Sequence, residues 1–172
     1  MTNPINRATL QSPRALAAWA LVAYVAVWLF FTFFDWVLPG DGSFSGRSAG
    51  AGFDSLTIMA MPVLAVLLAA HVTPAVPGAK LLAAIALIEY AVALFFGVIT
   101  LLIGLGAVFD GVNTINEVFD ALAYFVLGLG SLVLIGVAAY VVLRSYTELG
   151  GRLLPTPRPS QPGSVPPQAT AP

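Results

Sequence analysis

The chain has 172 residues, of which 59% are hydrophobic and only 9% are charged, and its formal net charge is −1. Water-soluble domains contain about 45–50% apolar and about 25% charged residues, so this composition excludes an ordinary soluble domain. There is no cysteine and only one histidine, which excludes disulfide bonds, thiolate catalysis and metal sites built from several histidines. No run of basic residues is dense enough to indicate nucleic-acid binding.

Four apolar segments follow one another along the chain. A helix needs roughly 20 mostly apolar residues to cross about 30 Å of hydrocarbon, and each segment approaches or exceeds that length; the second is the shortest. Inside their apolar centres the only charged residue is Glu89, in the third segment. We predict an all-α integral membrane protein, an up-and-down bundle of four transmembrane helices. The predicted spans are about 14–38, 54–72, 79–109 and 115–146.

The spans divide the chain into three parts. Residues 1–12 form a short N-terminal segment, residues 13–150 form the transmembrane domain, and residues 151–172 form a tail. The tail is rich in proline, with some Ser, Thr and Gln, so it cannot bury a core, and we predict disorder with polyproline II character. It is either a solvated extension or a docking strip for a partner domain that recognises Pro-rich segments.

The dipeptide Phe-Asp marks one end of every segment. It closes the first and third and opens the second and fourth, at residues 34–35, 109–110, 53–54 and 119–120. All four copies therefore lie at the same membrane face. Six of the seven basic residues fall on the opposite side, the exception being Arg47. Because Lys and Arg concentrate in cytoplasmic loops, we predict a multi-pass protein of the cell membrane with both termini in the cytoplasm.

Helix-end signals agree with these boundaries. Pro13 follows Ser12, which is typical of the first helical position, and Ser55 follows Asp54 as a cap for the second span. Thr114 to Glu117 has the spacing of a capping box. We expect Trp36 and two other aromatic side chains, Trp19 and Tyr146, to form an interfacial belt.

Two connections differ in length. Residues 39–54 are rich in Gly and Ser, and we predict a flexible outer loop. Residues 72–78 form a short turn that contains two prolines. So short a turn makes the second and third spans antiparallel neighbours.

Glu89 is the residue most costly to place in lipid. It lies nine residues after Lys80, about 13 Å along a helix, near the bilayer centre, where charged side chains are rare and face the protein interior. Steps of three and four residues put it on one helix face with small residues: Ala86, Ala93, Gly97, Thr100 and Gly104. Because small residues allow helices to approach closely in lipid, we predict that Glu89 faces another helix.

The same depth predicts two partners for Glu89. Tyr24 lies at that depth in the first span, and Pro62 lies there in the second. Proline lacks an N–H, so Pro62 leaves the carbonyl of Ile58 without its usual helical donor. A protonated Glu89 can donate to that carbonyl, and Tyr24 can donate to an ionised Glu89. Glu89 is then either a hydrogen-bonded helix clamp, which we favour, or a proton or cation site in a transport pathway.

The layout resembles that of small, uncharacterised four-span membrane proteins of high-GC actinobacteria. The shared features are cytoplasmic termini, an outer loop after an aromatic-rich first span (here residues 28–36) and a Pro-rich C-terminal tail. This bacterial resemblance rests on layout and implies no activity.

We predict a non-enzymatic protein, an accessory subunit or scaffold of the cell envelope, because the membrane interior lacks the convergent polar groups of an active site. The alternative is a small oligomeric transporter or channel component that uses Glu89. The acidic residues at the outer face match no calcium-loop spacing, so we predict no metal and no cofactor. The expected partners are the lipid bilayer, a protein bound through the tail or a helix face, and a second copy of the chain, with no nucleic acid.

Overall fold

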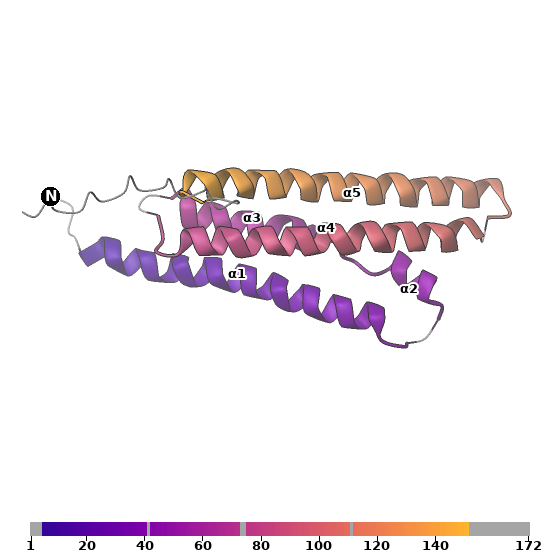
Figure 1. Ribbon diagram of the computed structural model, residues 1–172, viewed down its shortest axis with the longest axis horizontal. Helices are drawn as coiled ribbons and strands as arrows, with labels where there is room; N and C mark the ends of the chain where they lie inside the picture. The colour runs from indigo at the N-terminus through magenta and orange to yellow at the C-terminus, as the bar shows by residue number, and fades with distance from the viewer. Residues whose placement is uncertain (1–4, 41, 73–74, 111, 152–172) are drawn as a thin grey trace, which may run out of the picture.

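The computed structural model describes residues 5–40, 42–72, 75–110 and 112–151. These residues form five helices: α1 (Ile5–Val37), α2 (Phe44–Ala49), α3 (Leu56–Ala70), α4 (Ala79–Asp110) and α5 (Ile115–Glu148) (Figure 1). No strand occurs among them. The predicted Pro-rich tail, apart from Gly151, lies outside the described residues.

Three of the helices are long and apolar enough to cross a membrane. They are the 25 residues Pro13–Val37 of α1, the 32 residues of α4 and the 34 residues of α5. The second predicted span corresponds to α3, which has only 15 residues. At 1.5 Å per residue α3 is about 22 Å long, shorter than the hydrocarbon layer of about 30 Å. The protein is therefore helical, with three helices of membrane-spanning type and one shorter apolar helix.

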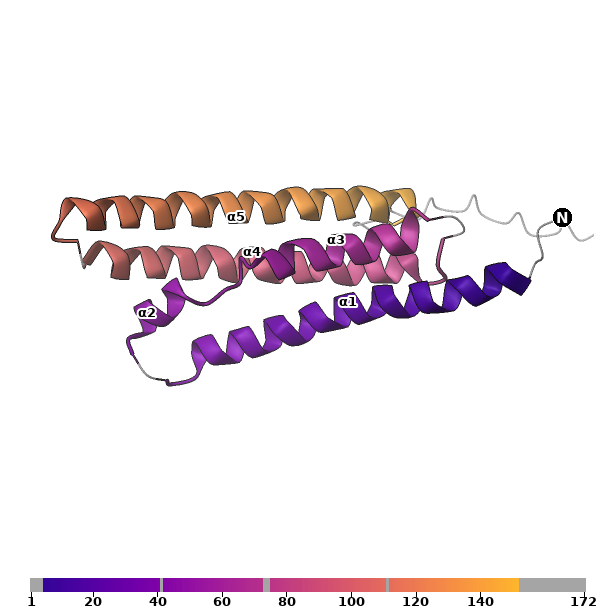
Figure 2. The ribbon, with the colours of Figure 1, turned by 180° about the vertical axis from the view of Figure 1, so that it is seen from behind.

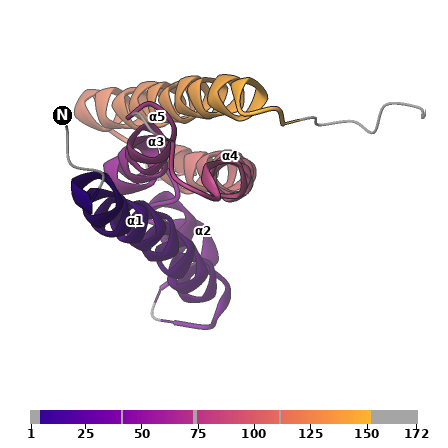
Figure 3. The same cartoon turned by 90° about the vertical axis from the view of Figure 1, so that its left-hand side faces the viewer.

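The long helices and α3 alternate in direction along the chain (Figure 1). In a view along the helices, α3 and α4 lie in the middle, with α5 on one side and α1 on the other (Figure 3). Accordingly α4 packs against α3, α5 and α1, whereas α1 and α5 do not contact each other within the described ranges. Both flanking helices therefore leave much of their surface uncovered by protein.

The predicted flexible outer loop at residues 39–54 is wrong at Phe44–Ala49, which form a helix. This stretch contains α2, which packs against α4 and the end of α1 (Figure 2). Trp36 is only 8% exposed, so it is a packing residue and not the interfacial residue we expected. Its Nε1 donates to Ser48 Oγ at 2.8 Å, and its ring contacts Phe44 and Phe53. These aromatic contacts bury apolar side chains at a place where the Gly/Ser content of the sequence indicates only a loop.

The helix termini follow local chemistry with one exception. The capping box of α5 is confirmed, with Thr114 and Glu117 each bonding the backbone of the other, and Ser55 caps α3 as expected. The first helix starts earlier than predicted, at Ile5, and Pro13 lies inside it. Proline removes one backbone donor and disfavours a continuous helix, but here it does not end α1.

Basic side chains hold together the end of the molecule where α3 meets α4. Arg14 Nη2 donates to the carbonyl oxygens of Leu68 at 2.9 Å and Val72 at 2.7 Å. A cation at the C-terminal carbonyls of a helix also interacts favourably with the helix dipole. Lys80 Nζ donates to the carbonyl of Gly150 at 3.0 Å, which links the start of α4 to the end of α5.

Candidate functional site

The predicted small-residue face of α4 is buried throughout, and its members are Ala86, Glu89, Ala93, Gly97, Thr100 and Gly104. A Cβ at Gly97 would meet Leu132 Cδ2 of α5 at 2.8 Å, and one at Gly104 would meet Ala49 Cα of α2 at 2.8 Å. Cβ atoms do not approach neighbours so closely, so both glycines permit the contact with the adjoining helix. The prediction that Glu89 faces protein is confirmed.

Glu89 is buried without a hydrogen-bond partner. Its side chain is 4% exposed, and neither Oε1 nor Oε2 is hydrogen-bonded to any described residue. It borders a hollow of about 360 Å³ between α1 and α4, whose other walls are apolar and include Leu29, Phe33, Val92 and Phe96. An isolated carboxylate is very unfavourable in such surroundings. This environment suits the carboxyl as a neutral acid or in company with a cation.

The hydrogen bonds that we predicted for Glu89 are wrong. Neither the Tyr24 hydroxyl nor the Ile58 carbonyl beside Pro62 bonds to its carboxyl. At 100° per residue, Tyr24 lies about 140° around α1 from Leu29, which faces the Glu89 hollow. Equal depth in the bilayer places two residues at a similar level along the helix axes. It does not determine which way each side chain points.

The clamp between α3 and α4 is made by the next residue, Tyr90. Its hydroxyl donates to the carbonyl oxygen of Met59 at 2.7 Å and accepts from the backbone N of Val63 at 3.1 Å. In a regular helix these two backbone groups would bond each other. The Tyr90 hydroxyl bonds to both of them, one residue after Pro62, whose missing N–H already removes one donor from this turn of α3. Pro62 is thus part of the helix contact, but with Tyr90.

One sequence signal could have identified this clamp. Tyr90 directly follows Glu89 and lies at the depth of Pro62. It is an aromatic residue whose hydroxyl can donate a hydrogen bond. Buried tyrosines usually find a partner for the hydroxyl, and a proline in the neighbouring helix offers irregular backbone.

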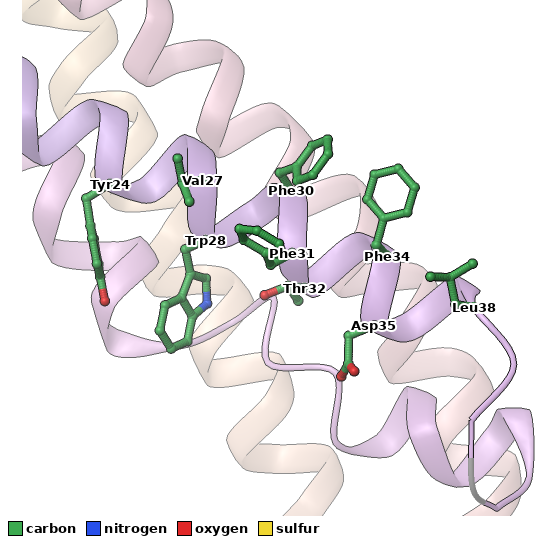
Figure 4. A pocket seen from close by; sticks show the side chains of 9 residues that line it. All are labelled: Tyr24, Val27, Trp28, Phe30, Phe31, Thr32, Phe34, Asp35 and Leu38. Carbon is green, nitrogen blue, oxygen red and sulfur yellow. The ribbon is translucent and has the colours of Figure 1, made fainter.

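Tyr24 lies on the outer surface of α1. It is 50% exposed and shares this surface with other aromatic side chains, as Figure 4 shows for Trp28 and Phe31. The shallow hollow there is lined by residues of α1 and by Leu38, which directly follows it, with Asp35 near its end. A surface formed by one helix encloses nothing and suits contact with acyl chains.

The described residues do not bring together a metal site. No group of three or more His, Cys, Asp or Glu side chains in the ranges covered by the structure lies close enough to hold a metal ion.

The structure is that of a helical protein with three helices of membrane-spanning type, and the buried Glu89 carboxyl has no hydrogen-bond partner among the described residues. Comparison with protein-family models finds no match, and comparisons with curated proteins and with solved structures find none either. The resemblance to actinobacterial four-span proteins stays a prediction.

Proposed function

We propose that this is a multi-pass protein of the bacterial cell membrane that crosses the bilayer four times, with both termini in the cytoplasm. The shorter α3 then spans with local thinning of the bilayer. The charges support this orientation, because Arg14, Lys80 and Arg144 lie at one end of the helices. At the opposite end lie the acidic residues Asp35, Asp110 and Glu117. Reporter fusions after residues 45 and 113 test the topology, and a cytoplasmic signal at either would contradict it.

We propose further that the protein is a small, oligomeric transport component in which the Glu89 carboxyl takes up and releases a proton or a cation. One observation supports this choice above others: Glu89 is buried at 4% exposure with both oxygens unpaired among the described residues. A structural clamp requires a partner, and Tyr90 makes the clamp to α3. A membrane acid without a structural partner is a functional-site hypothesis by default.

The test uses the chemistry of a protonated carboxyl in apolar surroundings. Dicyclohexylcarbodiimide, an apolar reagent that attacks protonated carboxyl groups, should label the purified protein at Glu89, less at high pH and not at all in Glu89→Gln. Proteoliposomes with an internal pH dye and an imposed potassium potential should then show proton flux that Glu89→Gln removes. Asp110→Asn, which alters an exposed acid at the end of α4, is the matched control and should leave both signals intact. Flux equal in wild type, Glu89→Gln and empty vesicles would refute the transport proposal.

A non-enzymatic accessory subunit or scaffold is the second candidate. The exposed aromatic surface of α1, which includes Tyr24, Trp28 and Phe31, favours it, because a helix on the edge of the molecule can pack against a partner helix. Cross-linking in native membranes through a photoreactive residue at Phe31 distinguishes the two candidates: a defined protein adduct supports the subunit, and lipid adducts alone contradict it.

A further inference from the structure

A second hollow, separate from Glu89, lies where the chain between α2 and α3 passes α4. Residues 50–55 are not helical, yet Phe53 is only 1% exposed and stacks on Phe96 at 5.4 Å. Phe96 and Gly97 are in the middle of α4, so this segment enters the depth of the helices instead of crossing over their ends. Non-helical backbone at membrane depth is tolerated where it is buried in protein or lines a polar cavity.

The cavity at this place measures about 210 Å³ and is bounded by the end of α2 with the segment that follows it, by α4 and by α5. Its polar side chains come from all three: Ser48 and Asp54, then Thr100, then Tyr124 and Ser131. Thr100 lies eleven residues beyond Glu89 in α4, about 16 Å along the axis, which corresponds to half the hydrocarbon thickness. The polar groups therefore gather toward the Asp110 end of the membrane-spanning helices, in the half of the bilayer that the proposed topology places outside.

The chemistry of the lining favours a cation. Asp54 is the only charged side chain that lines the cavity, and no Lys or Arg pairs with it in the described ranges. Thr100 Oγ1 donates to the carbonyl of Phe96 at 2.9 Å, and Ser48 Oγ donates to the carbonyl of Phe44 at 2.9 Å. Because its hydroxyl hydrogen is engaged, Thr100 Oγ1 presents its lone pairs as acceptors, whereas Ser48 Oγ already accepts from Trp36 Nε1 and has one lone pair left.

Arg47 of α2 is the basic residue closest to Asp54 in the sequence, and its side chain contacts other groups. Arg47 Nη1 donates to the carbonyl oxygens of Gly40 at 3.4 Å and Gly42 at 3.2 Å, and its guanidinium lies over the Phe44 ring. A carboxylate with oxygen acceptors and no basic neighbour is an environment for a cation. A single carboxylate favours a monovalent ion, since divalent ions such as Ca²⁺ recruit several.

The size of the cavity limits the ligand. A water molecule occupies about 30 Å³ in the liquid, so about 210 Å³ has room for a small ion with some of its waters or for a small amine. Close contacts border the cavity near Gly104, where Ala49 of α2 and the Tyr124 hydroxyl of α5 meet α4. These contacts keep the three walls together.

We propose that this cavity is a binding site for a small monovalent cation, an alkali ion or a small protonated amine. The Asp54 carboxylate supplies the charge, and the hydroxyls of Thr100 and Ser131 supply neutral oxygen ligands. The site rests on the proposed function only in placing the helices in lipid, and binding here does not require Glu89. The proposed site therefore specifies the class of ion that the proposed transport component would bind.

The experiment measures thermal unfolding of the purified full-length protein in detergent at constant ionic strength. Sodium, potassium and methylammonium chloride are titrated against N-methylglucamine chloride, whose cation is too bulky for the cavity. We expect a saturable rise in Tm with at least one of the small cations, and the comparison of metal ions with methylammonium identifies the source. Asp54→Asn should weaken the apparent affinity by at least about tenfold, as expected for loss of the only charged ligand. Ser131→Ala should weaken it less.

The controls separate this site from Glu89. Glu89→Gln and Asp110→Asn should retain the cation-dependent rise in Tm. If no small cation raises Tm above the N-methylglucamine value, the proposal is overturned. It is also overturned if the effect survives Asp54→Asn and disappears in Glu89→Gln, a result that would support the proposed function while assigning the cation to Glu89. Should Asp54→Asn fail to fold, Ser131→Ala and Thr100→Val decide, and unchanged affinity in both contradicts the site.

Discussion

Replacement of Tyr90 by Phe removes one hydroxyl from the clamp between α3 and α4 and leaves the ring in place. That hydroxyl makes two hydrogen bonds, at 2.7 Å to the Met59 carbonyl and at 3.1 Å from the Val63 N–H. Hydrogen bonds between membrane helices average about 0.6 kcal/mol and reach about 1.7 kcal/mol each. Loss of both should therefore lower the free energy of unfolding by about 1–3 kcal/mol. The lower end applies if the Val63 N–H and the Met59 carbonyl satisfy each other in the variant, as they would in a regular helix.

The assay is unfolding of the purified protein in mixed micelles by SDS titration, followed by circular dichroism. Tyr24→Phe is the matched control, because Tyr24 is half exposed and makes no hydrogen bond within the described part of the chain; its stability should equal that of the wild type. Pro62→Ala restores a backbone donor, so Tyr90→Phe should cost less in that background. Equal midpoints for Tyr90→Phe and Tyr24→Phe would refute the clamp.

Three further substitutions test the packing of α2, α4 and α5. Gly104→Leu should destabilise the protein by about 1–3 kcal/mol through overpacking, whereas Gly106→Leu, which has no neighbour within 4 Å, should not; equal melting of the two would contradict the close contact. Trp36→Phe removes the hydrogen bond to Ser48 and should speed hydrogen exchange in α2, and unchanged exchange would show that α2 is held otherwise. Glu117→Ala removes two bonds to backbone N–H groups, at 2.6 and 2.7 Å, and should lower the midpoint of SDS titration, because donors at the start of α5 lose their acceptor; an unaltered midpoint would show that the capping box contributes nothing.

The positions of the helices were predictable from the sequence. The prediction of 79–109 agrees with α4 at Ala79–Asp110, and 115–146 agrees with α5 at Ile115–Glu148. Apolar length, capping residues and the spacing of small residues act between neighbours along the chain, so they are visible before folding. For the same reason the burial of Glu89 could be inferred from the residues at three- and four-residue steps around it.

The contacts between segments were not predictable in this way. Residues 39–54 looked like a loop by composition, but Phe44–Ala49 form α2, and the stretch packs against α4 through the buried side chains of Ser48 and Phe53. The cavity beside Asp54 exists only because that segment, α4 and α5 meet. No single segment contains the information that would reveal it.

The sequence by itself determined that the chain forms long apolar helices, which face of α4 is buried and, within a few residues, where α3, α4 and α5 begin and end, but not the start of α1 or the presence of α2. Only the tertiary structure decided that Tyr90, and not Glu89, bonds the irregular backbone near Pro62. The physical reason is that spacing sets the depth of a residue along its own helix. The rotation of each helix, and the distant segment that packs against it, then determine which side chains meet.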